Sequence, residues 1–268
     1  MNYWPLKVIS TEIRKILAYR SDFWINFVGN TLIHLSVSRA LWQTIFAAQG
    51  VTEMRGLSLD QLTLYYVLAP ISVKVLMGEN IGFLAREIYD GGLNRYLIWP
   101  MPALGYKALT FLTHSIFYLI QLGLIYFVAR LVVDSTPVTS EELIRLVLGM
   151  GYLAIAGVGF FHLMCLCEMV SFWFDNAWTL GVMLKFALYF LGGTLVPLTF
   201  YPEHLQNLFS YLPFASMVSA PIQFIMGQAS EAQTIQSFIV LLIWIPVLFL
   251  LTQLMWKRGN LRYTGVGM

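Results

Sequence analysis

The chain alternates long apolar stretches with short polar segments. Six stretches reach the roughly 20 mostly apolar residues that a helix needs to cross a hydrocarbon core about 30 Å thick. They lie near residues 23–48, 59–80, 104–133, 143–173, 177–198 and 234–256. This pattern predicts an all-α integral membrane protein built as a six-span helical bundle, with a transmembrane domain over residues 23–256.

A further apolar stretch, residues 199–226, cannot form one straight span. Prolines interrupt it, and a proline inside a helix removes a backbone hydrogen bond and clashes with the preceding turn. Broken backbone is tolerated at membrane depth only where other protein covers it. We therefore expect an outer, proline-broken re-entrant segment before the last span, marked by Pro197, Pro202, Pro213, Phe214 and Pro221.

Residues 1–22 have a different pattern, in which apolar and charged side chains alternate at roughly helical spacing. The apolar positions are Trp4, Leu6, Val8, Ile9, Ile13, Ile16 and Leu17, and the charged ones among them are Lys7, Glu12, Arg14 and Lys15. A basic amphipathic helix of this kind lies in the membrane interface with its apolar side toward the lipid. The alternative is a solvated helix packed on soluble protein.

Composition supports the membrane assignment and excludes other classes. Hydrophobic residues make up 58% of the chain and charged residues only 11%, whereas a soluble domain carries about 25% charged residues. The net charge of +2 gives no reason to expect a nucleic-acid partner. Membrane lipid is the partner that this composition indicates.

Basic residues are distributed unevenly among the polar segments. One set lies before the first span, around the connection between the second and third spans, and after the last span: Lys7, Arg14, Lys15, Arg20, Arg86, Arg95, Lys107, Lys257, Arg258 and Arg262. The opposite set is Arg55, Arg130 and Arg145. Because cytoplasmic segments of membrane proteins carry the excess of Lys and Arg, we expect both termini, including the tail 257–268, in the cytoplasm.

The cytoplasmic connection 82–103 has too much structure for a plain linker. Residues 86–90 form a short amphipathic stretch, and Gly91 and Gly92 stop or turn it. Residues 93–99 can form a second short helix that ends before the following prolines. We expect this segment to lie against the membrane and to present a helix to a cytoplasmic partner.

Several motifs follow one another along nearly the whole chain. After the amphipathic N-terminus come Asp90-Gly91-Gly92-Leu93 with Leu97 and Pro100, then residues 195–202, then residues 212–214 with Pro221 and Gly227, and finally residues 259–263 with Gly265. In this order and spacing, the chain resembles the permease (membrane subunit) of type-2 ABC exporters. Its tail is similar to that of the subgroup whose permeases are encoded in pairs.

The resemblance implies partners outside this chain. Two permeases, either a homodimer or a pair of homologues, would lie in a bacterial inner (plasma) membrane, and each would bind a cytoplasmic ABC ATPase subunit that holds ATP and Mg²⁺. The residues that the resemblance implies for coupling to the ATPase are Arg86, Glu87, Tyr89, Asp90, Gly91, Gly92, Leu93, Arg95, Leu97 and Pro100. The 268 residues contain no G-x-x-x-x-G-K-[ST] loop to hold a nucleotide phosphate. We therefore expect no cofactor and no catalysis in this chain, with ATP hydrolysis in the partner.

Ionisable residues inside the expected spans are candidates for a substrate path or an inter-subunit contact, because a charge in lipid is costly without a partner. Arg39 lies in the first span, and Lys74 and Glu79 lie toward the inner end of the second. For Lys74 and Glu79, snorkelling to the interface is the alternative. In the fourth span, His162 and Cys165 share a helix face, but no further ligand cluster completes a metal site, and we expect none.

Two other functions stay open at this point. A secondary transporter or channel would work without an ATPase, and an internal inverted repeat would support it. None is visible between residues 23–133 and 143–256. A membrane-embedded enzyme would need convergent catalytic groups, which the isolated ionisable residues do not supply. The sequence favours the permease of an ATP-driven exporter.

Overall fold

The computed structural model describes residues 3–78, 83–99, 101–133, 138–174 and 178–265. Glu79 and Pro100, two residues expected at candidate sites, lie outside these ranges. The elements, in chain order, are α1 (Trp4–Ala18), α2 (Arg20–Gln49), β1 (Glu53–Met54), β2 (Leu57–Ser58), α3 (Leu59–Met77), α4 (Phe83–Tyr89), α5 (Asn94–Ile98), α6 (Ala103–Val133), α7 (Ser140–Met169), η1 (Val170–Phe172), α8 (Trp178–Leu191), η2 (Leu198–Phe200), α9 (Glu203–Ser210), α10 (Pro213–Met217), α11 (Ser219–Ile225) and α12 (Glu231–Asn260).

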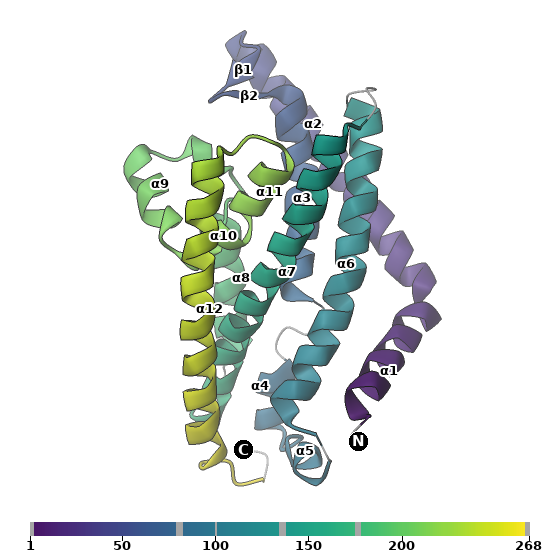
Figure 1. Ribbon diagram of the computed structural model, residues 1–268, viewed down its shortest axis with the longest axis vertical. Coiled ribbons are helices and arrows are strands. Elements are labelled where there is room, and N and C mark those ends of the chain that lie inside the picture. Colours follow the sequence, from purple (N-terminus) through teal and green to yellow (C-terminus); the bar gives the residue numbers. More distant parts are fainter. Residues whose placement is uncertain (1–2, 79–82, 100, 134–137, 175–177, 266–268) are drawn as a thin grey trace.

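Helix α3 lies at the centre of a helical bundle. It packs against α2, α6, α7 and α11, and most of its side chains are buried, including Leu68, Val75 and Leu76. Figure 1 shows α6, α7 and α12 extending along the long axis of the molecule, with the short helices α10 and α11 beside α12. The main hydrophobic core is therefore formed by α3 and the sides of its neighbours that face it.

The two ends of the bundle carry different elements. Both ends of the described chain lie at one end of the bundle, together with α4 and α5, and the small antiparallel β1–β2 hairpin lies at the opposite end (Figure 1). The segments that we expect in the cytoplasm are residues 1–22, 82–103 and 257–268. As far as they are described, these segments are therefore grouped together in the fold.

Three helices of the described chain are long and apolar enough to cross a membrane: α6, α7 continued by η1, and α12. A fourth candidate is α9 together with α10–α11, a pair bent by 75° that is either a broken span or a re-entrant loop. These helices confirm the class of all-α membrane protein. The count of six spans stays a prediction, because α8 is short and because α2 and α3 carry polar side chains such as His34, Asp60 and Lys74.

Three of the long helices begin with the same reciprocal cap. In each case a hydroxyl side chain before the helix accepts from a backbone N–H three residues later, and the Gln or Glu at that position accepts from the backbone N–H of the capping residue. The pairs are Ser58 with Gln61, Thr139 with Glu142, and Ser230 with Gln233. These caps satisfy backbone groups that would otherwise be unpaired at the start of α3, α7 and α12.

The prolines of residues 199–226 stand where short helices begin. Pro202 immediately precedes α9, Pro213 is the first residue of α10, and Pro221 lies in the first turn of α11. A proline is accepted there because the N–H it lacks has no partner within the helix. Helices α10 and α11 pack against α7 and α12, so protein covers this part of the interrupted backbone.

Glycines of α7 allow this close packing. A Cβ added at Gly149 would collide with the side chain of Ile225 on α11, and one added at Gly159 would lie 2.8 Å from Cε of Met217 on α10. Small residues let helices approach in a bilayer, where the hydrophobic drive between helices is weak. These two glycines of the fourth apolar stretch therefore have an intramolecular packing role.

Candidate functional site

The segment between the second and third apolar stretches folds as two short helices, α4 and α5. Gly91 joins them with φ at +74°, a left-handed conformation that glycine adopts without steric cost. Helix α4 packs on the end of α7 and on η1. The carboxylate of Glu168, near the end of α7 and 4% exposed, accepts a hydrogen bond of 2.8 Å from the backbone N–H of Leu84. This bond ties the first turn of α4 to α7.

Glu87 of α4 is the centre of a buried polar cluster. Its side chain points inward and the residue is 5% exposed. Its Oε2 lies 3.0 Å from Nζ of Lys107 on α6, and its Oε1 accepts a 2.9 Å hydrogen bond from the Tyr96 hydroxyl and forms an ion pair with Arg95. Burial raises the pKa of Tyr96, and the hydrogen bond to Glu87 raises it further, so the hydroxyl remains a donor. The cluster joins α4, α5 and α6.

Apolar contacts reinforce the same junction. Leu84, Ile88 and Leu93 are buried against Met169 and Phe172 at the end of α7 and in η1. The C-terminal tail adds to this contact. The aromatic residues Trp256 and Tyr263 pack on the cluster, and the carbonyl of Gly265 accepts a 2.7 Å hydrogen bond from Nδ2 of Asn94. Helices α6, α7 and α12 therefore all contact the α4–α5 segment or the tail beside it.

The outward side of the α4–α5 segment is exposed and amphipathic. It presents a charged pair, Arg86 and Asp90, with 3.2 Å between Nε and Oδ2, and the large side chains Tyr89, Ile98 and Trp99. Ile98 is 83% exposed. A mixture of charged and large apolar side chains on a short rigid element suits a protein-docking surface. We call the α4–α5 segment, as far as residues 83–99 describe it, the coupling segment, and these five residues its exposed face.

The residues that the sequence predicted for coupling fall into two groups. Arg86, Tyr89, Asp90 and Arg95 are exposed, whereas Glu87 and Leu93 are buried against the bundle. Gly91 and Gly92 form the connection between the two short helices. Leu97 belongs to α5 and Pro100 lies outside the described residues.

The N-terminal helix α1 packs on α6 through Val8, Glu12 and Ile16. From its charge, Glu12 would be expected on the solvent-facing side of α1. It is instead buried, with 4% of the residue exposed. Its carboxylate lies 2.7 Å from Nζ of Lys15 and 3.6 Å from Nε2 of His114 on α6. The hydrogen bond to Glu12 raises the pKa of Lys15.

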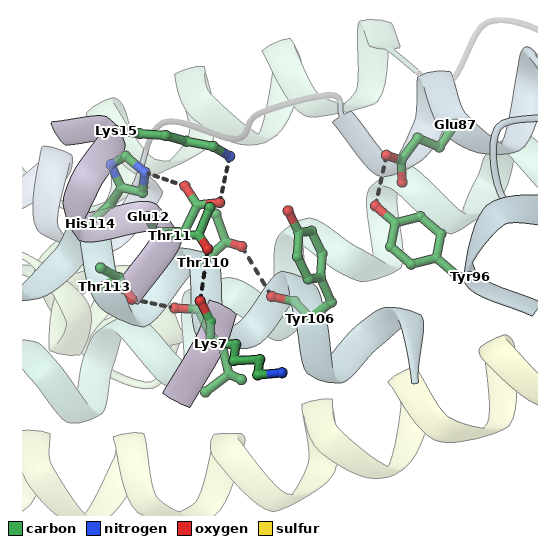
Figure 2. Close-up of polar contacts among 11 residues, drawn as sticks. Lys7, Thr11, Glu12, Lys15, Glu87, Tyr96, Tyr106, Thr110, Thr113 and His114 are labelled. Atoms are coloured by element: carbon green, nitrogen blue, oxygen red, sulfur yellow. Dashed lines mark hydrogen bonds and ion pairs between the residues drawn. The ribbon is translucent and has the colours of Figure 1, made fainter. Parts of the chain in front are cut away.

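Tyr106 connects this contact to the coupling segment. Figure 2 shows its ring between the Glu12–Lys15 pair and the Glu87–Tyr96 pair. The ring centroid of Tyr106 lies 5.7 Å from that of Tyr96 and 5.9 Å from that of Trp99. Residues from α1, α4, α5 and α6 therefore form one continuous set of contacts at this end of the bundle.

A cavity of about 300 Å³ lies among the helices, and no described residue of α4 or α5 lines it. Side chains of α2, α3, α6 and α8 line it. Its polar residues are Asn30, Thr31 and His34 from α2, Lys74 from α3 and Lys185 from α8. Lys74 is a residue that the sequence singled out, and the structure places it in this cavity together with a second lysine from a distant part of the chain.

Of the other two predicted intramembrane residues, the structure describes only Arg39. Arg39 forms an ion pair of 3.1 Å with Asp60 on α3, in which both side chains are about half exposed, and Glu79 lies outside the described residues. The polar cavity residues of α2 were not predicted as site residues, although the sequence carries a signal for them. Polar side chains recur at every fourth position from Asp22 into the first apolar stretch: Asp22, Asn26, Asn30, His34 and Ser38. This spacing predicts a polar stripe along one side of a helix.

Among the described residues, no group of three or more His, Cys, Asp and Glu side chains could hold a metal ion. The features above define an all-α membrane protein that carries two short helices with an exposed, amphipathic side at one end. Residues 32–267 match the sequence model of the family described as ABC-2 family transporter protein. The chain belongs to this family and is a permease component of an ABC transporter. No curated protein and no solved structure matches it.

Proposed function

We propose that this permease is half of the membrane domain of an ATP-driven exporter in a bacterial inner membrane. It spans the membrane six times, with both termini in the cytoplasm, and a second permease, identical or homologous, completes the substrate path. A separate cytoplasmic ABC ATPase subunit binds ATP and Mg²⁺ and docks on the exposed face of the coupling segment. One observation carries this proposal: the α4–α5 segment is exposed on one side and attached to the long helices α6 and α7 on the other.

The contacts of α4 and α5 with the bundle explain how a force from the docked ATPase would reach the long helices. A force on Arg86, Tyr89 or Ile98 acts on the same short helices that carry Glu87 and Leu93. Glu87 is bound to α6 through Lys107, and α4 is bound to α7 through Glu168. Movement of the ATPase would therefore displace α6 and α7 together, as rigid elements linked by packed and hydrogen-bonded contacts do.

Affinity purification of the tagged chain from its native cells in mild detergent, with mass spectrometry of the associated proteins, tests the proposal. We expect an ABC ATPase subunit to co-purify. The double variant Asp90→Arg/Ile98→Glu should reduce its recovery by about tenfold or more, because a reversed charge and a carboxylate in place of an apolar anchor at an interface each cost about 1 kcal/mol or more.

The matched control is Glu203→Lys, which reverses an exposed charge on α9, away from α4 and α5 (Figure 1). It should leave recovery of the ATPase unchanged. Failure to recover any ABC ATPase with the unaltered chain would overturn the proposed function. Equal recovery with the double variant and the control would overturn the docking surface.

A further inference from the structure

Another cavity, of about 270 Å³, lies between α6, α7 and α12. Each of these helices, α7 with its continuation η1, is long and apolar enough to cross a membrane. Three large apolar residues of the cavity wall, one from each helix, are exposed: Leu112, Val158 and Phe249. The cavity therefore opens at the side of the bundle, where hydrocarbon surrounds a spanning helix. We call it the lateral groove.

The polar side chains of the lateral groove lie at one end of it. Helix α6 begins, and α7 and α12 end, at the end of the bundle that carries α4 and α5 (Figure 1). His162 and Gln253 are the residues of α7 and α12 that line the groove nearest to this end, and Oγ1 of Thr252 lies 3.5 Å from the His162 carbonyl oxygen. The opposite end of the groove, at Val158 and Phe249, is apolar. The groove is therefore amphipathic along its length.

The polar groups suit the ester region of a glycerolipid. An imidazole and a side-chain amide can each donate a hydrogen bond, and an ester carbonyl oxygen accepts one. Nδ1 of His162 is buried and has no hydrogen-bond partner among the described residues. The Thr252 hydroxyl already donates to the carbonyl of Leu248, at 2.7 Å. His162 and Gln253 are therefore the polar side chains of the wall that we expect to contact an occupant.

Two residues place the polar end of the groove near the level of lipid head groups. Cη2 of Trp4 lies 3.4 Å from the position that a Cβ on Gly105 would take, so this indole of α1 lies beside the wall at the start of α6. Tryptophan is enriched at the membrane–water interface. Lys257 is exposed and follows Gln253 by four residues, which puts it one turn further along the same side of α12. A lysine at this level attracts anionic lipid.

The volume of the groove suits a hydrocarbon chain better than a helix of another protein. A helix with its side chains is about 10–12 Å across and rises about 5.4 Å per turn, so one turn occupies roughly 400 Å³ or more. The groove holds about 270 Å³. An acyl chain is narrower, and it has no polar atoms that would need a partner at the apolar end.

We propose that the lateral groove binds one anionic phospholipid of the inner leaflet. An acyl chain lies along Val158 and Phe249, the ester region lies at His162 and Gln253, and the head group lies near Lys257. The assignment to the inner leaflet rests on the orientation given under the proposed function. The groove and its polar end depend neither on that orientation nor on an ATPase.

Native mass spectrometry of the purified full-length chain in a neutral detergent tests the groove. The probes are phosphatidylglycerol and zwitterionic phosphatidylcholine with the same acyl chains. We expect one phosphatidylglycerol to bind more tightly than further copies, and Ala108→Leu, which adds a larger side chain to the wall, to weaken its binding by about tenfold or more. Ala40→Leu makes the same change at an exposed position of α2 that does not line the groove, and it should leave binding unchanged.

The contribution of the head group is tested at Lys257. Phosphatidylglycerol should bind more tightly than phosphatidylcholine, and Lys257→Gln should reduce this preference, whereas Lys257→Arg keeps the charge and should retain it. Arg55→Gln removes a positive charge at the β1–β2 hairpin, at the opposite end of the bundle (Figure 1), and should not change the preference.

A photoactivatable lipid locates the site without any variant, so a folding defect cannot mimic the result. Phosphatidylglycerol with a diazirine near the end of one acyl chain should cross-link to the unaltered chain near Leu112, Val158 or Phe249. Ala108→Leu should lose these cross-links, and Ala40→Leu should keep them.

Three results would overturn the proposal. Equal binding by Ala108→Leu and Ala40→Leu, or cross-links outside α6, α7 and α12, would show that the lipid binds elsewhere. Equal binding of the two lipids, unaffected by Lys257→Gln, would remove the anionic head group. A dimer of the chain that Ala108→Leu abolishes, with lipid binding unchanged, would assign the groove to a second copy.

These measurements separate the lipid site from the proposed function. Lipid binding that Ala108→Leu weakens, in a chain with which no ABC ATPase co-purifies, supports the site and overturns the exporter function. Lipid binding that Ala108→Leu leaves unchanged, in a chain that does recover an ABC ATPase, overturns the site and leaves the exporter function in place.

Discussion

Oε2 of Glu87 and Nζ of Lys107 lie 3.0 Å apart inside the end of the bundle that holds both ends of the described chain, with both side chains almost fully buried. The two residues come from different elements, the short helix α4 and the long helix α6. The pair therefore attaches a surface segment to a helix that is long and apolar enough to cross the membrane. The loss of folding stability therefore depends on which of the two partners is replaced.

Glu87→Gln should destabilise the chain more than Lys107→Met does. A buried charge left without its partner costs about 3–5 kcal/mol. Glu87→Gln removes the carboxylate 3.0 Å from Lys107 and leaves that lysine the charge of Glu168, whereas Lys107→Met leaves Glu87 with Arg95 and Tyr96. Thermal unfolding of the purified chain in detergent measures the difference. The double variant Glu87→Leu/Lys107→Met should be more stable than Glu87→Gln, and the reverse order would contradict this account of the pair.

The hydrogen bond from Leu84 to Glu168 predicts a local effect. Glu168→Ala leaves the Leu84 N–H without an acceptor, and an unsatisfied buried donor costs about 1–3 kcal/mol. Hydrogen exchange of the α4 backbone should become faster by about tenfold. Glu168→Gln keeps an oxygen acceptor and should show a smaller change. Equal exchange in α4 for the unaltered chain and both variants would show that this bond does not hold the segment.

Local features of the coupling segment could be predicted from sequence. The Gly91-Gly92 pair marks a turn and the stretches on either side of it, residues 86–90 and 93–99, are short helices, because backbone preference and helical spacing are properties of neighbouring residues. The same holds for the prolines of residues 199–226, which stand at helix starts. The side of these helices that is exposed was not predicted, since Glu87 and Leu93 were among the expected ATPase contacts and are buried.

Pairings between distant residues could not be predicted in this way. Lys107 contributes to the excess of positive charge on one side of the chain, yet it is buried against Glu87. His114 has no partner nearby in sequence, and its neighbour is Glu12 of the N-terminal helix. Nothing local in α1 distinguishes Glu12 from a solvated charge, since only the packing of α1 on α6 decides which of its sides is covered.

The Lys15–Glu12 contact predicts a dependence of stability on pH in the alkaline range. The pKa of Lys15 is raised above 10.5 in the folded chain, first by its hydrogen bond to Glu12. Its contribution is therefore fully present below pH 10.5 and is lost as pH rises through the raised value. Because the Lys15 side chain is more than half exposed, the effect is small.

Lys15→Met isolates this effect. The difference in unfolding temperature between the unaltered chain and Lys15→Met should be constant at about pH 8 and shrink toward zero at about pH 12, where lysines lose their charge. Other groups titrate in both proteins and cancel in the difference. A difference that grows with pH would have the wrong sign and would exclude the ion pair as its cause.

Gly259 predicts a steric effect on the C-terminal tail. A Cβ at this position would overlap the ring of Phe172, whose side chain is buried in the contact with the coupling segment. Gly259→Ala should therefore destabilise this junction by about 1–3 kcal/mol, the usual cost of overpacking. Limited proteolysis after the end of α12 should become faster. Gly151→Ala is the matched control, because a Cβ there meets nothing within 4 Å; equal effects would contradict the role of Phe172.

Two exposed positions test the proposed orientation of the chain. Ile98 lies on the exposed face of the coupling segment, and Asn207 is exposed on α9, away from it. With a maleimide that cannot cross membranes, Asn207→Cys should be labelled in cells whose outer membrane is permeabilised, and Ile98→Cys should not. In inside-out vesicles the order should reverse, and co-expression of the ATPase should slow labelling of Ile98→Cys.

The unaltered chain, with its native Cys165 and Cys167, gives the background. Labelling of both positions from one side would contradict the six-span topology, since an even number of crossings would then separate them.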